Sequence, residues 1–359
     1  MDLYLHIGTE KTGTTSVQRF FAANRELLKR NGVIYPAAPG GQNHMALTAA
    51  ALRDKKLGGD IREFFHIKTA EGLGEFRRTL EENLGAELRT GTYKSAVMSN
   101  EHCSSRLHKE DELEWLQDFL RKFFGRIHIV VYIRRQDEYA VSTYSTMIKS
   151  GSTNPLAIPS GPKLDRRYDY WDLLSLWSGV FGRDSVICRK FEKPSLKNGD
   201  IIDDMLDVTG LDASLDYERP KRLNESLDAA TLEFLRLFNM HVPKMAARQG
   251  QDTSRSKIAA RLAAISNGPF RTMADDDLTA FMAQFRETNR KVAVEYFGGA
   301  RTDSDDPLFA PRADERERVA EPTLTVERAV EICAWLWQNE PAQFDRAGRR
   351  KKKARGRPA

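Results

Sequence analysis

The hydrophobic pattern of the first half of the chain alternates between short apolar runs and helical repeats. Apolar runs of strand length predict buried strands at residues 3–7, 95–99, 127–133 and 186–191, with a short edge strand at 33–36. Between these runs, apolar residues recur every three or four positions, which predicts amphipathic helices over residues 14–31, 44–53, 73–88 and 113–124. Strands that alternate with helices are typical of parallel β-α-β units. The sequence therefore predicts an α/β fold with a central parallel sheet flanked by helices.

Beyond residue 134 the pattern becomes mostly helical. Its repeats predict helices over residues 138–149, 170–180, 229–240, 277–296 and 326–337. The segment 151–162 is rich in Gly, Ser and Pro, which predicts a mobile loop of the kind that serves as a lid. The chain thus combines an α/β first half with a helix-rich C-terminal half.

The first predicted strand runs directly into a loop that is bounded by Gly8 and Gly13 and rich in hydroxyl residues. Backbone amides in such a loop point at one bound group, the positive end of the helix that begins near Thr14 faces it, and Lys11 adds a full charge. The loop is predicted to hold phosphate or sulfate. The glycine spacing is that of a Walker A loop, but Thr14 follows Gly13 where a Walker A loop has its lysine. The loop is therefore similar to a P-loop but is not a Walker A loop, and we expect a P-loop-like fold.

Polar residues also follow two other predicted strands. Glu101 and His102 follow the second buried strand, and Arg134 and Arg135 follow the third, with Ser142 on the next helix. Ligands of open α/β sheets bind beyond the carboxyl ends of the strands, and a guanidinium there suits a second phosphate. The alternative is that the two arginines cap the sheet and pair with acidic residues in the first turn of the following helix.

These two motifs together resemble those of a known family. The loop 11–15, Lys-Thr-Gly-Thr-Thr, resembles the 5′-phosphosulfate-binding loop of sulfotransferases that use 3′-phosphoadenosine 5′-phosphosulfate (PAPS). Arg134 with Ser142 eight residues later resembles their 3′-phosphate-binding motif. Further details are closest to bacterial members of the carbohydrate sulfotransferase type, over roughly residues 1–300. The resemblance implies that the nucleotide is held by Lys11, Thr12, Gly13, Thr14, Thr15, Ser16, Arg134, Ser142 and Phe191.

The resemblance also implies an activity: a sulfuryl group passes from PAPS to a hydroxyl, less often an amine, of a carbohydrate or glycolipid acceptor, and adenosine 3′,5′-bisphosphate is left. Such a transfer needs alignment and charge stabilisation, and the implied in-line displacement uses no metal. Lys11 would neutralise charge on the leaving phosphate oxygen.

The attacking group must lose a proton, so a general base is expected near the sulfuryl group. Glu101 is the first candidate because it ends the strand expected beside the loop, and His44 is the rival. Each has a structural alternative: Glu101 orients a loop or pairs with a lysine, and His44 contacts backbone at a helix start. His102 is expected to point away from Glu101 if the strand continues.

Two other function classes stay open. A Mg²⁺-dependent P-loop kinase would use Glu101 as the metal-binding acid. A non-catalytic polyanion-binding protein would use the basic C-terminal tail, in which eight Lys and Arg residues fall within the last fourteen positions. The formal net charge of the chain is +5, so the rest of it carries −3. No specific nucleic-acid partner is predicted, whereas weak contact of the tail with anionic lipid at the inner face of a membrane stays open.

The remaining features indicate where the protein works and how the chain is divided into domains. It begins Met-Asp with no signal-peptide pattern and holds no apolar run of membrane-spanning length, so we expect a cytoplasmic protein. Its three cysteines are expected to be reduced, and no zinc spacing occurs. We expect a catalytic domain over residues 1–300, an extension with one helix over 301–345 and a disordered tail over 346–359. The sequence does not indicate an oligomeric state.

Overall fold

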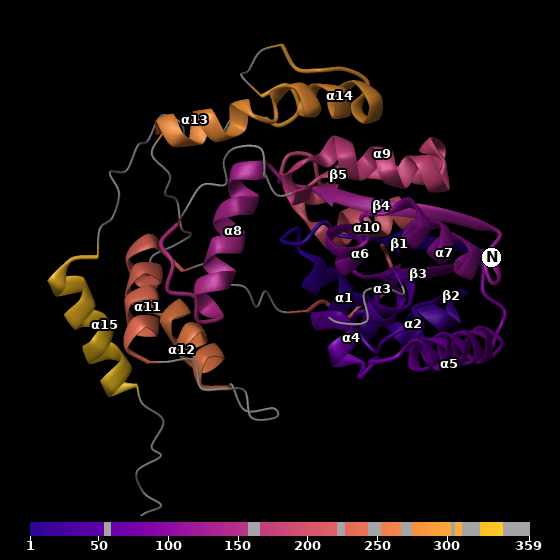
Figure 1. Cartoon of the computed structure of the whole chain (residues 1–359), viewed down its shortest axis with the longest axis horizontal. Helices are drawn as coiled ribbons and strands as arrows, with labels where there is room; N and C mark the ends of the chain where they lie inside the picture. Colours follow the sequence, from indigo (N-terminus) through magenta and orange to yellow (C-terminus); the bar gives the residue numbers. More distant parts are fainter. Residues whose placement is uncertain are drawn as a thin grey trace, which may run out of the picture. The chain divides into compact units, whose positions relative to one another are not determined.

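The computed structural model of the chain falls into two compact units (Figure 1). Unit 1 comprises Met1–Thr143, Ala157–Leu223 and Met273–Arg318, and unit 2 comprises Tyr144–Leu156, Asn224–Thr272 and Val319–Ala359. The structure describes residues 1–53, 59–156, 166–220, 227–242, 253–266, 275–302, 306–310 and 324–339. The predicted lid lies partly outside these residues, and the basic tail lies wholly outside them.

A sheet of five parallel strands forms the centre of unit 1, in the spatial order β2-β3-β1-β4-β5. The strands are β1 (Asp2–His6), β2 (Val33–Ile34), β3 (Ser95–Ser99), β4 (Arg126–Ile133) and β5 (Val186–Lys190). The register sets Leu5 of β1 beside Met98 of β3 and Ile129 of β4. Because parallel strands end at one edge of a sheet, the segments that follow β1, β3 and β4 meet there. The predicted α/β fold with a central parallel sheet is confirmed.

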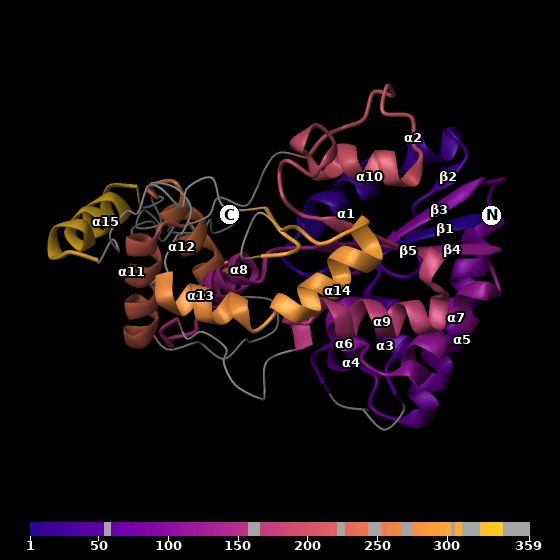
Figure 2. The same cartoon turned by 90° about the horizontal axis from the view of Figure 1, so that it is seen from above.

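Helices cover both faces of this sheet (Figure 2). On one face lie α1 (Thr14–Ala23), α2 (Arg25–Arg30) and α10 (Ile201–Thr209), which share an apolar core with Val130 and Tyr132 of β4. The other face carries α3 (Met45–Ala51), α5 (Ala70–Leu88), α7 (Glu110–Arg121) and α9 (Tyr170–Phe181), which share a core with Ile129 and Val131. Neighbouring residues of β4 thus face opposite layers, as expected for a strand that is buried on both sides.

Several predicted helices differ from the observed ones. The expected helix 14–31 breaks at Asn24, whose side-chain Nδ2 donates to the carbonyl oxygens of Phe20 and Glu218, both at 2.8 Å. The expected helix 277–296 is divided into α13 (Asp275–Ala283) and α14 (Arg286–Phe297). Four short or polar helices were not predicted: α4 (Asp60–Phe64), α6 (His102–Arg106), α10 and α12 (Thr253–Ala263).

Unit 2 is helical in its described part. The helix α8 (Gln136–Lys149) begins in unit 1 and ends in unit 2, which also holds α11 (Ala229–His241), α12 and α15 (Val326–Gln338). Its apolar core includes Ile148, Leu232, Leu262 and Ile332. Among the described residues of the whole chain, no helix is both long and apolar enough to span a membrane.

Candidate anion-binding site

The loop between β1 and α1 is shaped by its two glycines. Gly8 has a φ of +100°, and a Cβ at this position would lie 3.1 Å from the Cα of Glu101 and from the Oγ of Ser104. A side chain here would therefore strain the backbone and crowd the segment after β3. Gly13 has a φ of +77° and directly precedes α1. Glycine at these two positions allows the loop to approach α6 closely and to turn sharply into the helix.

Two threonines hold the loop against the neighbouring strand. Thr9 donates to the carbonyl oxygen of Tyr132 on β4 through its backbone N, at 2.8 Å, and through its Oγ1, at 3.0 Å. The buried Thr12 donates from Oγ1 to the carbonyl oxygen of Thr9 at 2.6 Å. The Thr12 side chain thus shapes the loop from inside.

The start of α1 is electrostatically suited to an anion. The helix has ten residues, no side-chain cap at Gly13 and no acidic residue in its first turn, so its positive end is not compensated locally. Thr14 is buried, Ser16 is half-buried and Thr15 is exposed. The three hydroxyl residues that the sequence singles out after Gly13 therefore differ in access, and Thr15 is the most open of them.

Lys11 lies in the middle of this loop with a φ of +66° and is half-buried. Burial lowers the pKa of its ammonium group. The negative charges of Glu10 and Glu101 partly offset this lowering, and the positive charge of Arg167 adds to it. Its Nζ makes no hydrogen bond or ion pair with the residues that the structure describes. A partly desolvated cation without a fixed partner favours an anionic ligand.

Arg134 connects the end of β4 to the loop. Its Nη1 donates to the carbonyl oxygen of Lys11 at 3.1 Å, and its Nε donates to Glu138 at 3.0 Å. The neighbouring Arg135 pairs with the buried Asp137 at 3.1 Å. Both arginines therefore make the ion pairs with the following helix that the alternative interpretation predicted, and Arg134 additionally reaches the anion loop. Its Nη2 has no hydrogen-bond partner within the described part of the chain.

Phe191 lies against the same loop. Its backbone N donates to the carbonyl oxygen of Ile133 at 2.7 Å, which continues the pairing of β5 with β4. A Cβ on Gly13 would lie 3.3 Å from the Phe191 ring, and the guanidinium carbon of Arg134 lies 5.7 Å from the centre of that ring. The loop, the arginine and the aromatic ring therefore share one corner of the sheet edge.

Ser142, the other predicted 3′-phosphate ligand, lies on α8, about 9 Å along the helix axis from Gln136, the first residue of that helix.

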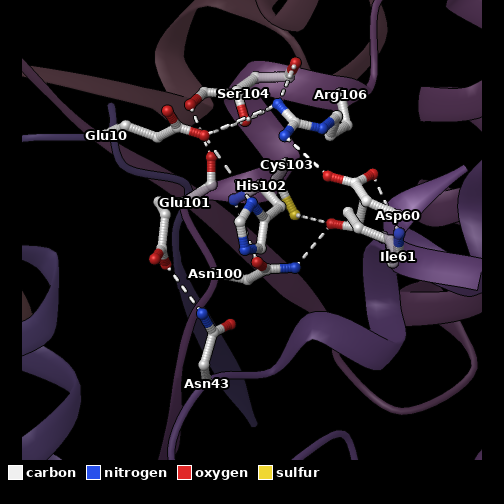
Figure 3. A network of polar contacts seen from close by, with 12 residues as sticks. Glu10, Asn43, Asp60, Ile61, Asn100, Glu101, His102, Cys103, Ser104 and Arg106 are labelled. Carbon is white, nitrogen blue, oxygen red and sulfur yellow. Dashed lines mark hydrogen bonds and ion pairs between the residues drawn. The ribbon is translucent and has the colours of Figure 1, made fainter. Parts of the chain in front are cut away.

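Two side-chain amides hold one oxygen of the Glu101 carboxylate, and Figure 3 shows one of them, that of Asn43. Its Oε2 accepts hydrogen bonds from Nε2 of Gln18, at 2.5 Å, and from Nδ2 of Asn43, at 3.0 Å. Its Oε1 accepts none from the described residues. The negative charge of Glu101 also raises the pKa of Lys11. The arrangement fixes the carboxylate beside the loop and leaves one oxygen for another group.

Gln18 and Asn43 were not singled out from the sequence. Gln18 is buried on α1 next to Val17 and Phe21, which belong to the sheet-facing apolar core. That isolated polar residue was the available signal, because a buried amide needs a partner. Asn43 offered no comparable signal, since it stands in a Gly-rich loop.

The structure places His44 away from any open space. Its ring is fully buried, Nε2 donates to the carbonyl oxygen of Pro36 at 2.7 Å, and Nδ1 accepts from the backbone N of Ser99 at 2.8 Å. Burial lowers the pKa of His44 to about 4. Both ring nitrogens are thus occupied by backbone groups, which is the structural role considered for His44. The geometry does not support the rival role as a general base.

A second carboxylate, Glu10, lies next to Lys11 in the chain, and three side chains contact one of its oxygens (Figure 3). Its Oε1 accepts from Oγ of Ser105 at 2.7 Å and lies 3.7 Å from Nη1 of Arg106 and 3.8 Å from Nδ1 of His102. Burial alone would raise the pKa of Glu10, but these contacts lower it to about 2. His102 was expected to point away if the strand continued; instead β3 ends at Ser99, α6 begins at His102, and the ring faces Glu10.

A cleft opens beside Thr9 in unit 1. It is lined by Ser104 and Ser105 of the segment after β3 and by Arg166 and Arg167 of the short 3₁₀ helix η1 (Arg166–Tyr168). Arg166 makes a two-pronged pair with Asp172, at 2.9 and 2.8 Å. The cleft therefore adjoins the anion loop through Thr9, and Arg167, whose positive charge lowers the pKa of Lys11, lines it as well.

No protein-family model matches the chain. Over 173 residues it is 28% identical to an uncharacterized protein of Archaeoglobus fulgidus, a match that covers 47% of this chain and 46% of that protein. The chain thus spans about half the length of the curated relative that it matches.

Two of the solved structures to which the chain is similar are sulfotransferases. The sulfotransferase from Alicyclobacillus acidocaldarius matches with a TM-score of 0.45 and 11% identity, over 82% of this chain and 95% of that one. The sulfotransferase domain of the Synechococcus PCC 7002 olefin synthase matches with a TM-score of 0.31 and 14% identity, over 74% of this chain and 94% of that one. Any assignment of activity to this chain must come from its own residues.

Proposed function

We propose that this chain transfers a sulfuryl group from PAPS to a hydroxyl of a carbohydrate or glycolipid acceptor. The observation that carries the proposal is the meeting of three groups at one corner of the sheet edge. These are the Lys11 loop, the guanidinium of Arg134 bonded to that loop at 3.1 Å, and the Phe191 ring against Gly13. The loop suits a 5′-phosphosulfate, the guanidinium suits a 3′-phosphate, and the ring suits a base.

In the proposed reaction, the acceptor oxygen forms a bond to sulfur while the bond between sulfur and the bridging oxygen of the 5′-phosphate breaks. The leaving phosphate oxygen gains negative charge, and the ammonium of Lys11 is the cation placed to neutralise it. The backbone N–H groups at the start of α1, with Thr14, Thr15 and Ser16, hold the non-bridging oxygens. The buried Thr12 side chain contributes by fixing the loop, not by contacting the nucleotide.

Recognition of the 3′-phosphate is assigned to Arg134 and Ser142. The guanidinium is already oriented by Glu138 and by the carbonyl oxygen of Lys11, through Nε and Nη1. A phosphate would add a partner to Nη2, so little side-chain entropy is lost when the nucleotide binds. This contact would distinguish PAPS from nucleotides that lack a 3′-phosphate.

The general base is assigned to Glu101. The proton of the acceptor hydroxyl passes to Oε1, while the amide groups of Gln18 and Asn43 hold Oε2. His44 is not used, because its two nitrogens are bonded to Pro36 and Ser99. The Mg²⁺-dependent kinase remains the competing function, since Glu101 at the end of β3 also has the position of a metal-binding acid.

The test is transfer of labelled sulfate from PAPS to cell-envelope glycans and glycolipids, measured with and without a chelator. We expect transfer to survive the chelator and Lys11→Ala to lower it about 10²- to 10³-fold. Lys122→Ala is the matched control, because Lys122 follows α7 and pairs with the exposed Glu81. Phosphate transfer from ATP that stops with the chelator would overturn the proposal in favour of the kinase.

A further inference from the structure

The last described helix, α15, presents an apolar stripe to solvent. Val326, Val330 and Trp337 are 76%, 62% and 78% exposed, and Cys333 between them is also exposed. Their spacings of four, three and four residues put all four side chains on one face of the helix. Large apolar side chains grouped in this way on a surface mark an interaction site.

The stripe is not the face by which α15 joins unit 2. Ile332, on another face, is buried in the unit 2 core. Arg328 donates from Nη2 to the carbonyl oxygen of Ile265 at 2.7 Å and lies 3.7 Å from Asp228. Figures 1 and 2 both show α15 beside α11 and α12, with which it packs. Because these contacts fix the rotation of α15, the apolar stripe is held outward.

The sequence that follows α15 carries a second signal. Eight Lys and Arg residues and no acidic residue occupy positions 346–359, which begin seven residues after Asn339. A polybasic segment of this density is attracted to anionic lipid headgroups, by roughly a factor of five for each Lys or Arg at the surface. Stable membrane binding usually needs two signals, one apolar and one electrostatic. This end of the chain supplies both.

We propose that the stripe Val326, Val330, Cys333 and Trp337, together with the segment 346–359, binds the surface of an anionic membrane. The helix would lie in the interface with Trp337 at headgroup level. The exposed Glu327 and Glu331 oppose this binding, but the eight tail cations outnumber them. A second copy of the chain is the less suitable partner for the stripe, because α15 is only about 20 Å long and two strongly basic tails would then repel each other.

The experiment is co-sedimentation of the full chain with vesicles of phosphatidylcholine alone or with about 30% phosphatidylglycerol. We expect the partition coefficient to be at least tenfold higher on the anionic vesicles and to fall with salt. Ending the chain after residue 345 should lower it at least tenfold, and the double variant Val330→Ser, Trp337→Ser should lower it about fivefold or more. Phe64→Ser is the control, because Phe64 is 66% exposed on α4 of unit 1, and it should bind as the parent does.

A second readout reports on insertion directly. Lipids with brominated acyl chains should quench part of the tryptophan fluorescence, and Trp337→Phe should remove that part while the protein still sediments. Unchanged sedimentation of the double variant, or no quenching, would overturn the proposal. A dimer of the parent that the double variant dissociates would overturn it in favour of a second copy. The inference is independent of the proposed activity, because the shortened chain should still bind adenosine 3′,5′-bisphosphate.

Discussion

The charges of two carboxylates, Glu10 and Glu101, raise the pKa of Lys11, and the two are held by different kinds of partner. Glu10 accepts from Ser105 and contacts Arg106 and His102, and these contacts lower its pKa to about 2. Glu101 is bonded on one oxygen, by two neutral amides, and has its other oxygen without a partner in the described part of the chain. A carboxylate that is paired with cations stabilises the fold, whereas a carboxylate that is oriented by neutral amides can exchange a proton with a ligand.

Of the changes considered, we expect a substitution of Glu101 to have the largest effect on activity. Glu101→Gln keeps the size of the side chain but removes the oxygen that accepts the proton, so we expect kcat for sulfuryl transfer to fall about 10³-fold. Binding of adenosine 3′,5′-bisphosphate should change little, because the nucleotide contacts lie on the other groups. Full activity of this variant would show that Glu101 is not the base.

The same change at Glu10 should instead affect stability. Glu10→Gln removes the negative charge beside Arg106 and His102, although Arg106 keeps its ion pair with Asp60, and we expect the free energy of unfolding to fall by about 2 kcal/mol at pH 7. Because the folded pKa of about 2 lies below the ordinary value of 4.5, this stabilisation is fully present above about pH 4.5 and is lost as the pH falls toward 2. Urea unfolding of the parent and of Glu10→Gln between pH 3 and pH 7 measures how far their free energies of unfolding approach each other as the pH falls. An equal difference at pH 3 and pH 7 would contradict this account of Glu10.

The smallest expected effect concerns the amides behind Glu101. Gln18→Met has nearly the volume of the parent and removes one donor to Oε2, so we expect kcat to fall about tenfold with KM for PAPS unchanged. Gln117→Met is the matched control, because the Gln117 amide is also buried but donates to the carbonyl oxygen of Val180 on another part of unit 1. Equal losses in both variants would assign Gln18 to stability alone.

The elements that position the two carboxylates were only partly predictable from sequence. The strand ends and the anion loop could be predicted because apolar runs and the glycines at 8 and 13 are local signals. The break at Asn24 depends on a hydrogen bond to Glu218, 194 residues away, so the local helical pattern did not show it. The start of α6 was missed because the sequence His-Cys-Ser-Ser-Arg has no helical apolar repeat.

The fate of the two carboxylates shows the same limit. Sequence placed Glu101 beside the loop, but the amides that hold it come from positions 83 and 58 residues away. The partner Ser105 of Glu10 is 95 residues away. Whether a carboxylate is paired with cations or oriented by neutral amides is thus a tertiary property. The same applies to His44, whose burial between Pro36 and Ser99 arises only when β3 and α3 come together.

Calorimetry of the chain with adenosine 3′,5′-bisphosphate and with adenosine 5′-monophosphate tests most directly whether the site is built for PAPS. The account predicts a preference of about tenfold or more for the bisphosphate, because a charge-assisted contact with Arg134 is worth roughly 1.5–3 kcal/mol. Arg134→Ala should abolish the preference, while Arg126→Ala, at the exposed start of β4, should keep it. Equal affinities in the parent, or equally tight binding of ATP with Mg²⁺, would contradict a site built for PAPS.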